Sequence, residues 1–231
     1  MRRAVLACAH VLALALSSGC ADRTAAARGE ALFSDPSLAG SSLNAVSCAT
    51  CHSTGDDPRL LAGGSLRGVV ARPSYWGGSE LDLRAAIEDC LYFFMRAPVR
   101  DALPEGDGRG RDLLAYLDTL GDAPATAVPF TVPPTLPSAL APGDAARGAA
   151  LYDRGCRSCH GAPHTGAGAP SPLAPVVPEA TIAEHGSFAP QIVVAKIRHG
   201  GFYGIGGAMP PFSVETASDQ DLADLVAALG L

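Results

Sequence analysis

The chain has 231 residues and a formal net charge of −6, with 17 lysine and arginine residues against 23 aspartate and glutamate residues. An acidic chain of this kind binds the phosphate backbone poorly, so the composition argues against a nucleic-acid partner. The length is sufficient for two domains of about 100 residues each.

The first 19 residues are typical of an export signal. Two arginines follow Met1, an apolar run extends from Ala4 to Leu16, and small residues precede Cys20. Such a segment is removed from the mature protein, and its apolar run is too short to remain as a membrane span. We therefore predict a signal peptide over residues 1–19 and export to the periplasm.

The residues that precede Cys20 also indicate a lipid anchor. The segment Leu16-Ser-Ser-Gly-Cys20 resembles the lipobox of bacterial lipoproteins, with Ser17 where leucine is usual. That resemblance implies a lipid-modified Cys20 as the first residue of the mature chain, and simple secretion is the alternative. Acyl chains would hold the protein at a membrane, by default the outer membrane.

Two helical segments recur in both halves of the chain. Residues 27–33 (ARGEALF) resemble residues 146–152 (ARGAALY), and residues 112–121 resemble residues 221–230. Each half is thus predicted to begin and end with a helix.

Gly29 and Gly148 lie inside the first helix of each half. Glycine is costly within a helix unless another element approaches closely, so we expect the last helix of each half to cross there. The predicted contacts at these crossings join Phe33 to Tyr116 and Tyr152 to Leu225.

The pentapeptide Cys-x-x-Cys-His occurs twice, and its two copies start 108 positions apart. Two thiols one helical turn apart can add to the vinyl groups of a haem, and the adjacent imidazole then reaches the iron. Zinc sites and redox dithiols also use Cys-x-x-Cys pairs, but neither requires a histidine directly after both pairs. We therefore predict two covalently bound haem c groups. The predicted attachment cysteines and proximal iron ligands are Cys48, Cys51, His52, Cys156, Cys159 and His160.

Both halves resemble class I cytochrome c domains, which are small all-helical folds around one haem. In the second half the resemblance includes residues 206–212 (GGAMPPF), which are similar to the segment that carries the sixth iron ligand in that family. It implies that Met209 ligates the iron and raises its reduction potential. In the first half residues 63–68 (GGSLRG) are similar to the stretch that supports the proximal histidine, with Gly64 in place of proline.

The resemblance implies an all-α fold of two tandem cytochrome c domains. We expect the first domain over residues 20–121 and the second over residues 144–231. Residues 122–143 are rich in proline and predict a semi-rigid, extended linker, which does not by itself determine how the two haems are arranged.

The sequence leaves two candidates for the sixth ligand of the first haem. A helix is predicted between a cap at Ser79 and a stop at Pro98, and it carries both Cys90 and Met95. Met95 supplies a neutral, soft ligand of the kind that suits electron transfer. A Cys90 thiolate would lower the potential and mark a reactive haem, and the alternative for Cys90 is a small buried apolar group.

Other side chains near the motifs have two interpretations each. Arg67, Arg72, Tyr75 and Trp76 either hydrogen-bond the haem propionates or simply pack or lie on the surface. His199 is expected in the last turn of a helix that begins near Pro190, where a positive charge favours the helix dipole.

These features predict a dihaem c-type cytochrome that passes single electrons between a redox protein donor and acceptor in a periplasmic or membrane-associated respiratory chain. One alternative is a haem enzyme, similar to cytochrome c peroxidase or thiosulfate dehydrogenase, with the first haem as its active site. Another is a subunit of a larger respiratory complex. The sequence offers no acid/base constellation beside the first motif, so no catalytic residue is predicted.

Overall fold

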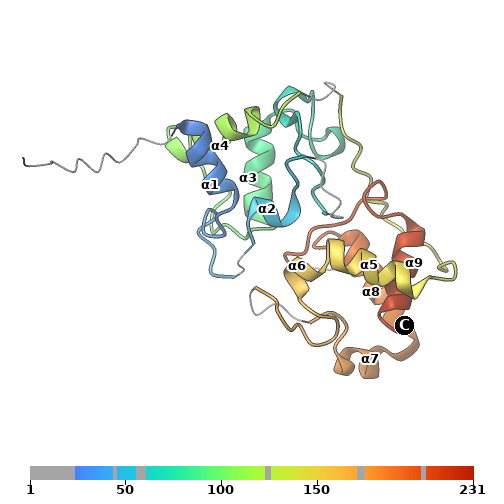
Figure 1. Ribbon diagram of the computed structural model, residues 1–231. Helices are drawn as coiled ribbons and strands as arrows, with labels where there is room; N and C mark the ends of the chain where they lie inside the picture. Colours follow the sequence, from blue (N-terminus) through green and yellow to red (C-terminus); the bar gives the residue numbers. More distant parts are fainter. Residues whose placement is uncertain (1–23, 44–45, 56–60, 123–125, 171–174, 204–206) are drawn as a thin grey trace, which may run out of the picture.

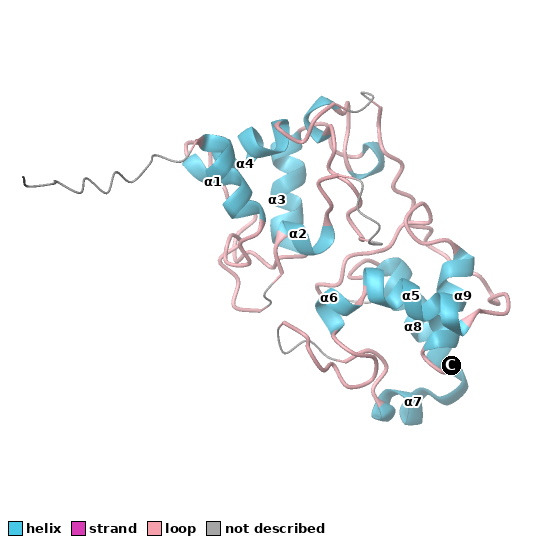
Figure 2. Ribbon diagram, viewed as in Figure 1, coloured by secondary structure: helices cyan, strands magenta, loops and turns pink. Residues whose placement is uncertain are grey.

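The computed structural model describes most of the chain. The described residues are 24–43, 46–55, 61–122, 126–170, 175–203 and 207–231. The predicted signal peptide and the predicted lipid anchor at Cys20 lie outside these ranges. Within them the secondary structure is helical, with two isolated β-bridges and no strand, which agrees with the all-α expectation (Figure 2). None of the helices described is long and apolar enough to cross a membrane.

The helices form two consecutive groups, which Figure 1 shows as a blue-to-green half and a yellow-to-red half. The first group, here called the N-terminal unit, contains α1 (Ala25–Phe33), α2 (Cys48–Cys51), α3 (Leu83–Phe93) and α4 (Gly108–Asp118). The second group, the C-terminal unit, contains α5 (Ala145–Gly155), α6 (Arg157–His160), α7 (Glu179–His185), α8 (Ala189–His199) and α9 (Asp219–Ala228). Short 3-10 helices cover Val69–Ala71, Trp76–Gly78 and Gly186–Phe188.

Helices α1 and α4 cross at Gly29, as the sequence predicts. A Cβ atom on Gly29 would collide with the backbone carbonyl of Asp112 in α4, so only glycine allows this approach. Beside the crossing, the rings of Phe33 and Tyr116 lie 5.4 Å apart between centroids. The Arg28 side chain also pairs with the Asp112 carboxylate at 2.7 Å.

Helices α5 and α9 repeat this arrangement in the C-terminal unit. Here Gly148 lies against the backbone carbonyl of Asp224. Tyr152 and Leu225 are buried in the same apolar cluster. The Ser218 hydroxyl caps the first turn of α9 by accepting a hydrogen bond from the backbone N–H of Asp221, in a capping box.

Each unit has its own apolar core. The core of the N-terminal unit includes Phe33, Leu91, Met95, Leu103, Leu113 and Leu117. The core of the C-terminal unit includes Leu151, Tyr152, Val194, Phe212, Leu222 and Leu225. Ala62 of the N-terminal unit is 7% exposed and belongs to the second of these clusters, so the two units pack directly against each other.

The boundaries of α3 differ from the predicted ones. Its cap is Asp82, whose carboxylate accepts a hydrogen bond from the Ala85 N–H at 2.8 Å, and the expected cap at Ser79 is wrong. The Ser79 hydroxyl instead donates to the Trp76 carbonyl at 2.8 Å, inside the turn that precedes the helix. The helix ends at Phe93, before Pro98, because Arg96 adopts a left-handed conformation with φ of 60°.

The described part of the proline-rich linker has no helix or strand, and it contacts both units. Its residue Phe130 packs against Trp76 of the N-terminal unit, with ring centroids 5.6 Å apart. The next three residues bind the C-terminal unit through four hydrogen bonds. These join the Thr131 N–H to Glu215 (2.9 Å), the Val214 N–H to the Thr131 carbonyl (3.0 Å), the Tyr203 hydroxyl to the Val132 carbonyl (3.1 Å) and His199 Nε2 to the Pro133 carbonyl (2.9 Å).

Candidate functional site

The first Cys-x-x-Cys-His motif forms a single helical turn, α2. Ser47 caps this turn together with Thr50 in a capping box. The turn brings the Cys48 and Cys51 thiols to the same side of the chain, as the helical spacing predicts. Burial raises the pKa of Cys48 to about 11 and that of Cys51 to about 12, so both are neutral thiols at pH 7.

His52 follows α2 in an extended conformation and is oriented by Gly63. Its Nδ1 lies 2.9 Å from the Gly63 carbonyl oxygen. Because a carbonyl can only accept, Nδ1 carries the proton and the lone pair resides on Nε2. Burial lowers the pKa of His52 to about 4, which keeps the ring neutral. A Cβ on Gly63 would overlap the imidazole ring, so this glycine makes the space in which the ring lies.

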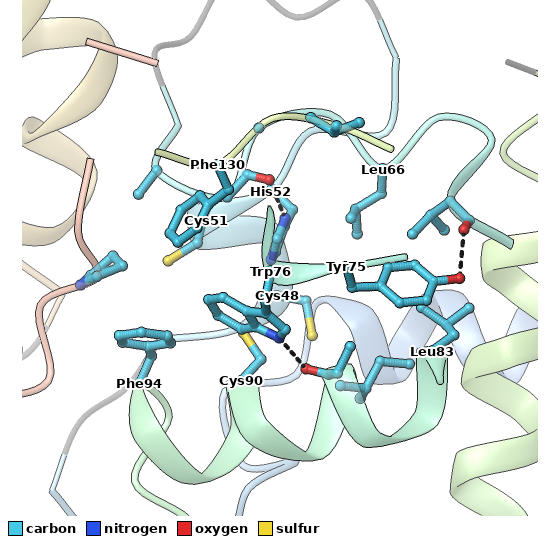
Figure 3. A pocket seen from close by; sticks show the side chains of 18 of the residues that line it. Cys48, Cys51, His52, Leu66, Tyr75, Trp76, Leu83, Cys90, Phe94 and Phe130 are labelled. Carbon is cyan, nitrogen blue, oxygen red and sulfur yellow. Dashed lines mark hydrogen bonds between the residues drawn. The ribbon is translucent and has the colours of Figure 1, made fainter. Parts of the chain in front are cut away.

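The first motif faces an apolar cavity whose opposite wall is the inward face of α3 (Figure 3). The structure brings five residues singled out in the sequence to this cavity, namely Cys48, Cys51, His52, Cys90 and Met95. Met95 is 3% exposed and also packs into the core of the N-terminal unit. Burial raises the pKa of Cys90 well above its usual value, which opposes the thiolate form.

Arg72, Tyr75 and Trp76 also line the cavity, but their polar groups already have backbone partners. The Arg72 guanidinium donates to the Ser65 carbonyl at 2.7 Å. The Tyr75 hydroxyl donates to the Val69 carbonyl, and the Trp76 indole N–H donates to the Ala86 carbonyl, bonds that Figure 3 marks with dashed lines. The structure therefore favours packing over propionate binding for Tyr75 and Trp76.

Trp76 is held in a strained backbone conformation. Its φ is 52°, in the left-handed region that costs about 1–2 kcal/mol for a residue with a side chain. The indole is fixed there by stacking on Phe94 at 5.8 Å and by its edge contact with Phe130. Strain of this kind persists only where surrounding contacts determine the position of the residue.

The second motif spans the whole of α6, which is a single helical turn. Cys156 is its N-cap and His160 its last residue, and the buried Tyr152 hydroxyl donates to the adjacent Gly161 carbonyl at 3.0 Å. Burial raises the pKa of Cys156 to about 12 and also raises that of Cys159. All the cysteines that the structure describes, Cys48, Cys51, Cys90, Cys156 and Cys159, are free thiols.

The loop that carries Met209 is fixed to α8. Arg198 has no exposed surface, and its guanidinium donates to the Phe212 carbonyl at 2.7 Å and to Asp219 at 2.9 Å. Gly200, with φ of 58°, lies against the Met209 carbonyl and has no room for a Cβ. Met209 itself is partly buried against the core of the C-terminal unit.

The first site fits a covalently bound haem. It combines two neighbouring thiols, a neutral imidazole with its Nε2 lone pair available, and an apolar cavity bordered by a buried thioether. When bound, haem c supplies a one-electron couple at its iron. Within the described ranges, no three side chains of histidine, cysteine, aspartate or glutamate are arranged to hold a metal ion by themselves.

Comparison with known families places the second site in context. Residues 143–227 match the family model described as cytochrome c oxidase, cbb3-type, subunit III. This match supports a c-type cytochrome. The cytochrome c domain implies covalently bound haem c and haem-based electron transfer. A comparison with curated proteins gives no match.

Sequence reasoning missed part of the cavity wall around the first site. Phe130 of the linker and Pro210 and Pro211 of the C-terminal unit line the same cavity as Cys51 and His52. Pro210 and Pro211 belong to the segment that carries Met209, but no motif or periodicity relates them or Phe130 to the first site, because that role depends on how the two units pack. Cys90 and Met95 both border this cavity, but the prediction that one helix carries both is wrong, because α3 ends at Phe93 and Met95 lies beyond it.

Proposed function

We propose that this c-type cytochrome binds two haem c groups and passes single electrons between a redox protein donor and acceptor in a periplasmic or membrane-associated respiratory chain. The observation that carries the proposal is the first cavity, where Cys48, Cys51, His52 and Met95 converge in the part of the chain that the family model does not match. The second haem would be held by Cys156, Cys159, His160 and Met209.

The proposed architecture is two tandem class I cytochrome c domains. The repeated crossing of the first and last helices, at Gly29 and at Gly148, supports this arrangement. We further propose export through the N-terminal signal and lipid attachment at Cys20, which would anchor the protein to the outer membrane on its periplasmic side.

For the first haem we propose Met95 as the sixth ligand. Met95 borders the cavity, is almost fully buried and is neutral at every pH, whereas the environment of Cys90 disfavours a thiolate. A His/Met pair gives a six-coordinate iron suited to electron transfer, and a thiolate would mark the haem enzyme considered above.

The test begins with haem stoichiometry. Mass measurement of the purified protein should give two covalent haems per chain, and a Cys51→Ser, Cys48→Ser variant should retain one. A single haem in the unaltered protein would contradict the proposal.

Spectra of the oxidised protein then identify the ligand. In Met95→Ala the near-infrared band of methionine-ligated iron should fall by about half, since one of the two proposed haems loses its methionine ligand but stays covalently attached. Cys90→Ala should leave that band unchanged. Thiolate features that disappear in Cys90→Ala would instead favour the enzyme.

A further inference from the structure

Large apolar side chains are exposed together at the C-terminal end of α3. Tyr92, Phe93 and Val99 are 37%, 39% and 56% exposed, and the Tyr92 and Phe93 rings meet edge to face with centroids 5.2 Å apart. The Arg100 guanidinium lies over both rings, 5.7 Å from the Tyr92 centroid and 5.1 Å from the Phe93 centroid, and it pairs with Asp89 at 2.5 Å. These contacts fix the two rings in place on the surface. We call Tyr92, Phe93, Val99 and Arg100 the α3 patch.

The α3 patch lies on the same helix end as the wall of the first cavity. Cys90 and Phe94 point from α3 into the cavity, and Met95 also lines it (Figure 3). Tyr92 and Phe93 lie between these residues in the chain and are exposed. A helix with its side chains is about 10 Å across, so a molecule bound on the α3 patch would be separated from the first site by about one helix diameter.

Beside the patch, Arg96 occupies a position that favours glycine. The Ala97 N–H donates to the Leu91 carbonyl at 2.9 Å, as in the motif that commonly ends helices, and Arg96 has the left-handed φ of 60° that this motif requires. Arg96 is exposed, and no carboxylate of the described residues pairs with it. The helix dipole favours a cation at this end, but a basic residue in the last turn provides that without strain. The described part of the chain therefore gives no reason for a strained arginine here, which points to a partner outside it.

The composition of the α3 patch fits a transient contact with another protein. Exposed apolar patches with a polar rim mark interaction sites, and tyrosine, phenylalanine and arginine are enriched in protein interfaces. Electron-transfer encounters use small interfaces, so a patch of this size is sufficient. Rings fixed against each other suit a complementary protein surface. A second copy of this chain fits poorly, because two identical patches would bring two unpaired Arg96 cations into one small interface.

We propose that the α3 patch and Arg96 dock a redox protein that has an apolar contact surface with a carboxylate at its rim, an inference that rests on the proposed function. Tyr92 and Phe93 form the apolar centre of the contact, and Arg96 pairs with the carboxylate of the partner. In the docked complex one electron passes between the redox centre of the partner and the first haem. One centre is oxidised as the other is reduced, with no proton or further reactant.

The experiment uses the full-length protein with both haems bound. The probe is a reduced plant-type [2Fe–2S] ferredoxin, an acidic protein whose low potential drives one electron to ferric haem. Stopped-flow spectroscopy measures the rate of haem reduction at several salt concentrations. Phe93→Ser and Val99→Ser change the apolar surface, and Arg96→Gln removes the unpaired charge. Phe188→Ser and Arg111→Gln are the matched controls, since Phe188 is 70% exposed in the C-terminal unit and Arg111 is exposed in α4.

In the unaltered protein we expect reduction that slows as the salt concentration rises, because salt screens the attraction between the two proteins. Phe93→Ser should lower the rate by about fivefold or more, and Val99→Ser should also lower it. Arg96→Gln should lower the rate at low salt by about twofold to fivefold. Both controls should keep the rate of the unaltered protein, and the visible spectrum should be the same in all of these variants.

Arg96→Gly separates docking from a structural role of the arginine. Glycine adopts the left-handed conformation without strain, so the melting temperature should stay the same or rise while the reduction by ferredoxin slows. A lower melting temperature with an unchanged rate would assign Arg96 to the stability of α3 and would overturn its role in docking.

Three further outcomes would overturn the inference. One is a rate that Phe93→Ser, Val99→Ser and Arg96→Gln leave as unchanged as the controls do, which means that electrons enter elsewhere. The others are a dimer seen by sedimentation, or binding to phosphatidylglycerol vesicles, that Phe93→Ser abolishes, because the patch would then serve a second copy or a membrane. All of these can occur in a protein with two electron-transferring haems, so they leave the proposed function intact. A single haem per chain would contradict the proposed function independently of these rates.

Discussion

At the scale of single residues, the first site depends on the pairing of His52 with Gly63. The backbone carbonyl of Gly63 fixes the tautomer of the imidazole, and the missing side chain leaves space for the ring. Orientation by a backbone acceptor is typical of histidines that ligate metals, because it aims the free nitrogen and restrains the ring.

Gly63→Ala should therefore impair iron ligation at the first site. The new methyl group would overlap the His52 ring, which must then rotate away from its carbonyl partner. We expect the low-spin bands of the visible spectrum to fall to about half their intensity, because the proposed second haem would be unaffected. The measurement is the visible spectrum of the oxidised and reduced protein, normalised to haem content.

Gly55→Ala serves as the control for this variant, since a Cβ on Gly55 meets no atom within 4 Å. A normal low-spin spectrum in both variants would show that His52 does not depend on Gly63.

At the scale of helices, each unit depends on a crossing between its first and last helix. The sequence predicts both crossings because an interior glycine has few other uses in a helix. The capping box of α9 was also predictable, since Ser218 and Asp221 have the required spacing. The start of α3 was not, because the competing role of Ser79 in the preceding turn depends on the bridge between Tyr75 and Glu80.

Gly29→Ala should destabilise the N-terminal unit. The added methyl group meets the backbone carbonyl of Asp112, so the helices must separate, which costs roughly 1–3 kcal/mol. Better helix propensity offsets about 1 kcal/mol of this cost. We expect a net loss of up to about 2 kcal/mol in the free energy of unfolding, measured by denaturant titration of the haem-loaded protein.

A helical glycine without such a contact provides the comparison. Gly108 begins α4, and a Cβ there would meet only the end of the Arg111 side chain at 3.9 Å. Gly108→Ala should leave the stability unchanged or slightly raised. If Gly29→Ala and Gly108→Ala lower the free energy of unfolding equally, the crossing at Gly29 has no special requirement for glycine.

At the scale of the whole molecule, the linker joins the two units through two adjacent residues, Phe130 and Thr131. Phe130 packs on the N-terminal unit, and Thr131 binds Glu215 of the C-terminal unit. Burial acts to raise the pKa of Glu215, but hydrogen bonds from Thr131 and Ser213 outweigh it and lower the pKa to about 2. The contact of the linker with the C-terminal unit is therefore strongest when Glu215 is ionised.

This linkage predicts how the stability depends on pH. Because the pKa of Glu215 is lower in the folded state, its contribution is complete above the ordinary value of 4.5 and is lost as the pH falls toward 2. Glu215→Gln should lower the melting temperature at pH 7. The difference in melting temperature between the variant and the unaltered protein should disappear as the pH falls from 4.5 to 2. The melting temperatures of both proteins are measured by circular dichroism at a series of pH values.

Glu105→Gln, which changes an exposed glutamate of the N-terminal unit, is the control for nonspecific charge effects. If the difference in melting temperature between Glu215→Gln and the unaltered protein stays constant down to pH 2, the ionised Glu215 carboxylate does not hold the linker.

The sequence by itself predicted the candidate haem-binding residues and the helical repeats of this protein. Thiols, imidazoles and glycines act over a few residues or through spacing along a helix, so Cys48, His52 and Gly29 could be identified without coordinates. Only the tertiary structure decided that Phe130 and Pro210 close the first cavity and that the proline-rich linker binds both units. These contacts join residues far apart in the chain, and they form only when two folded surfaces meet, which no local pattern records.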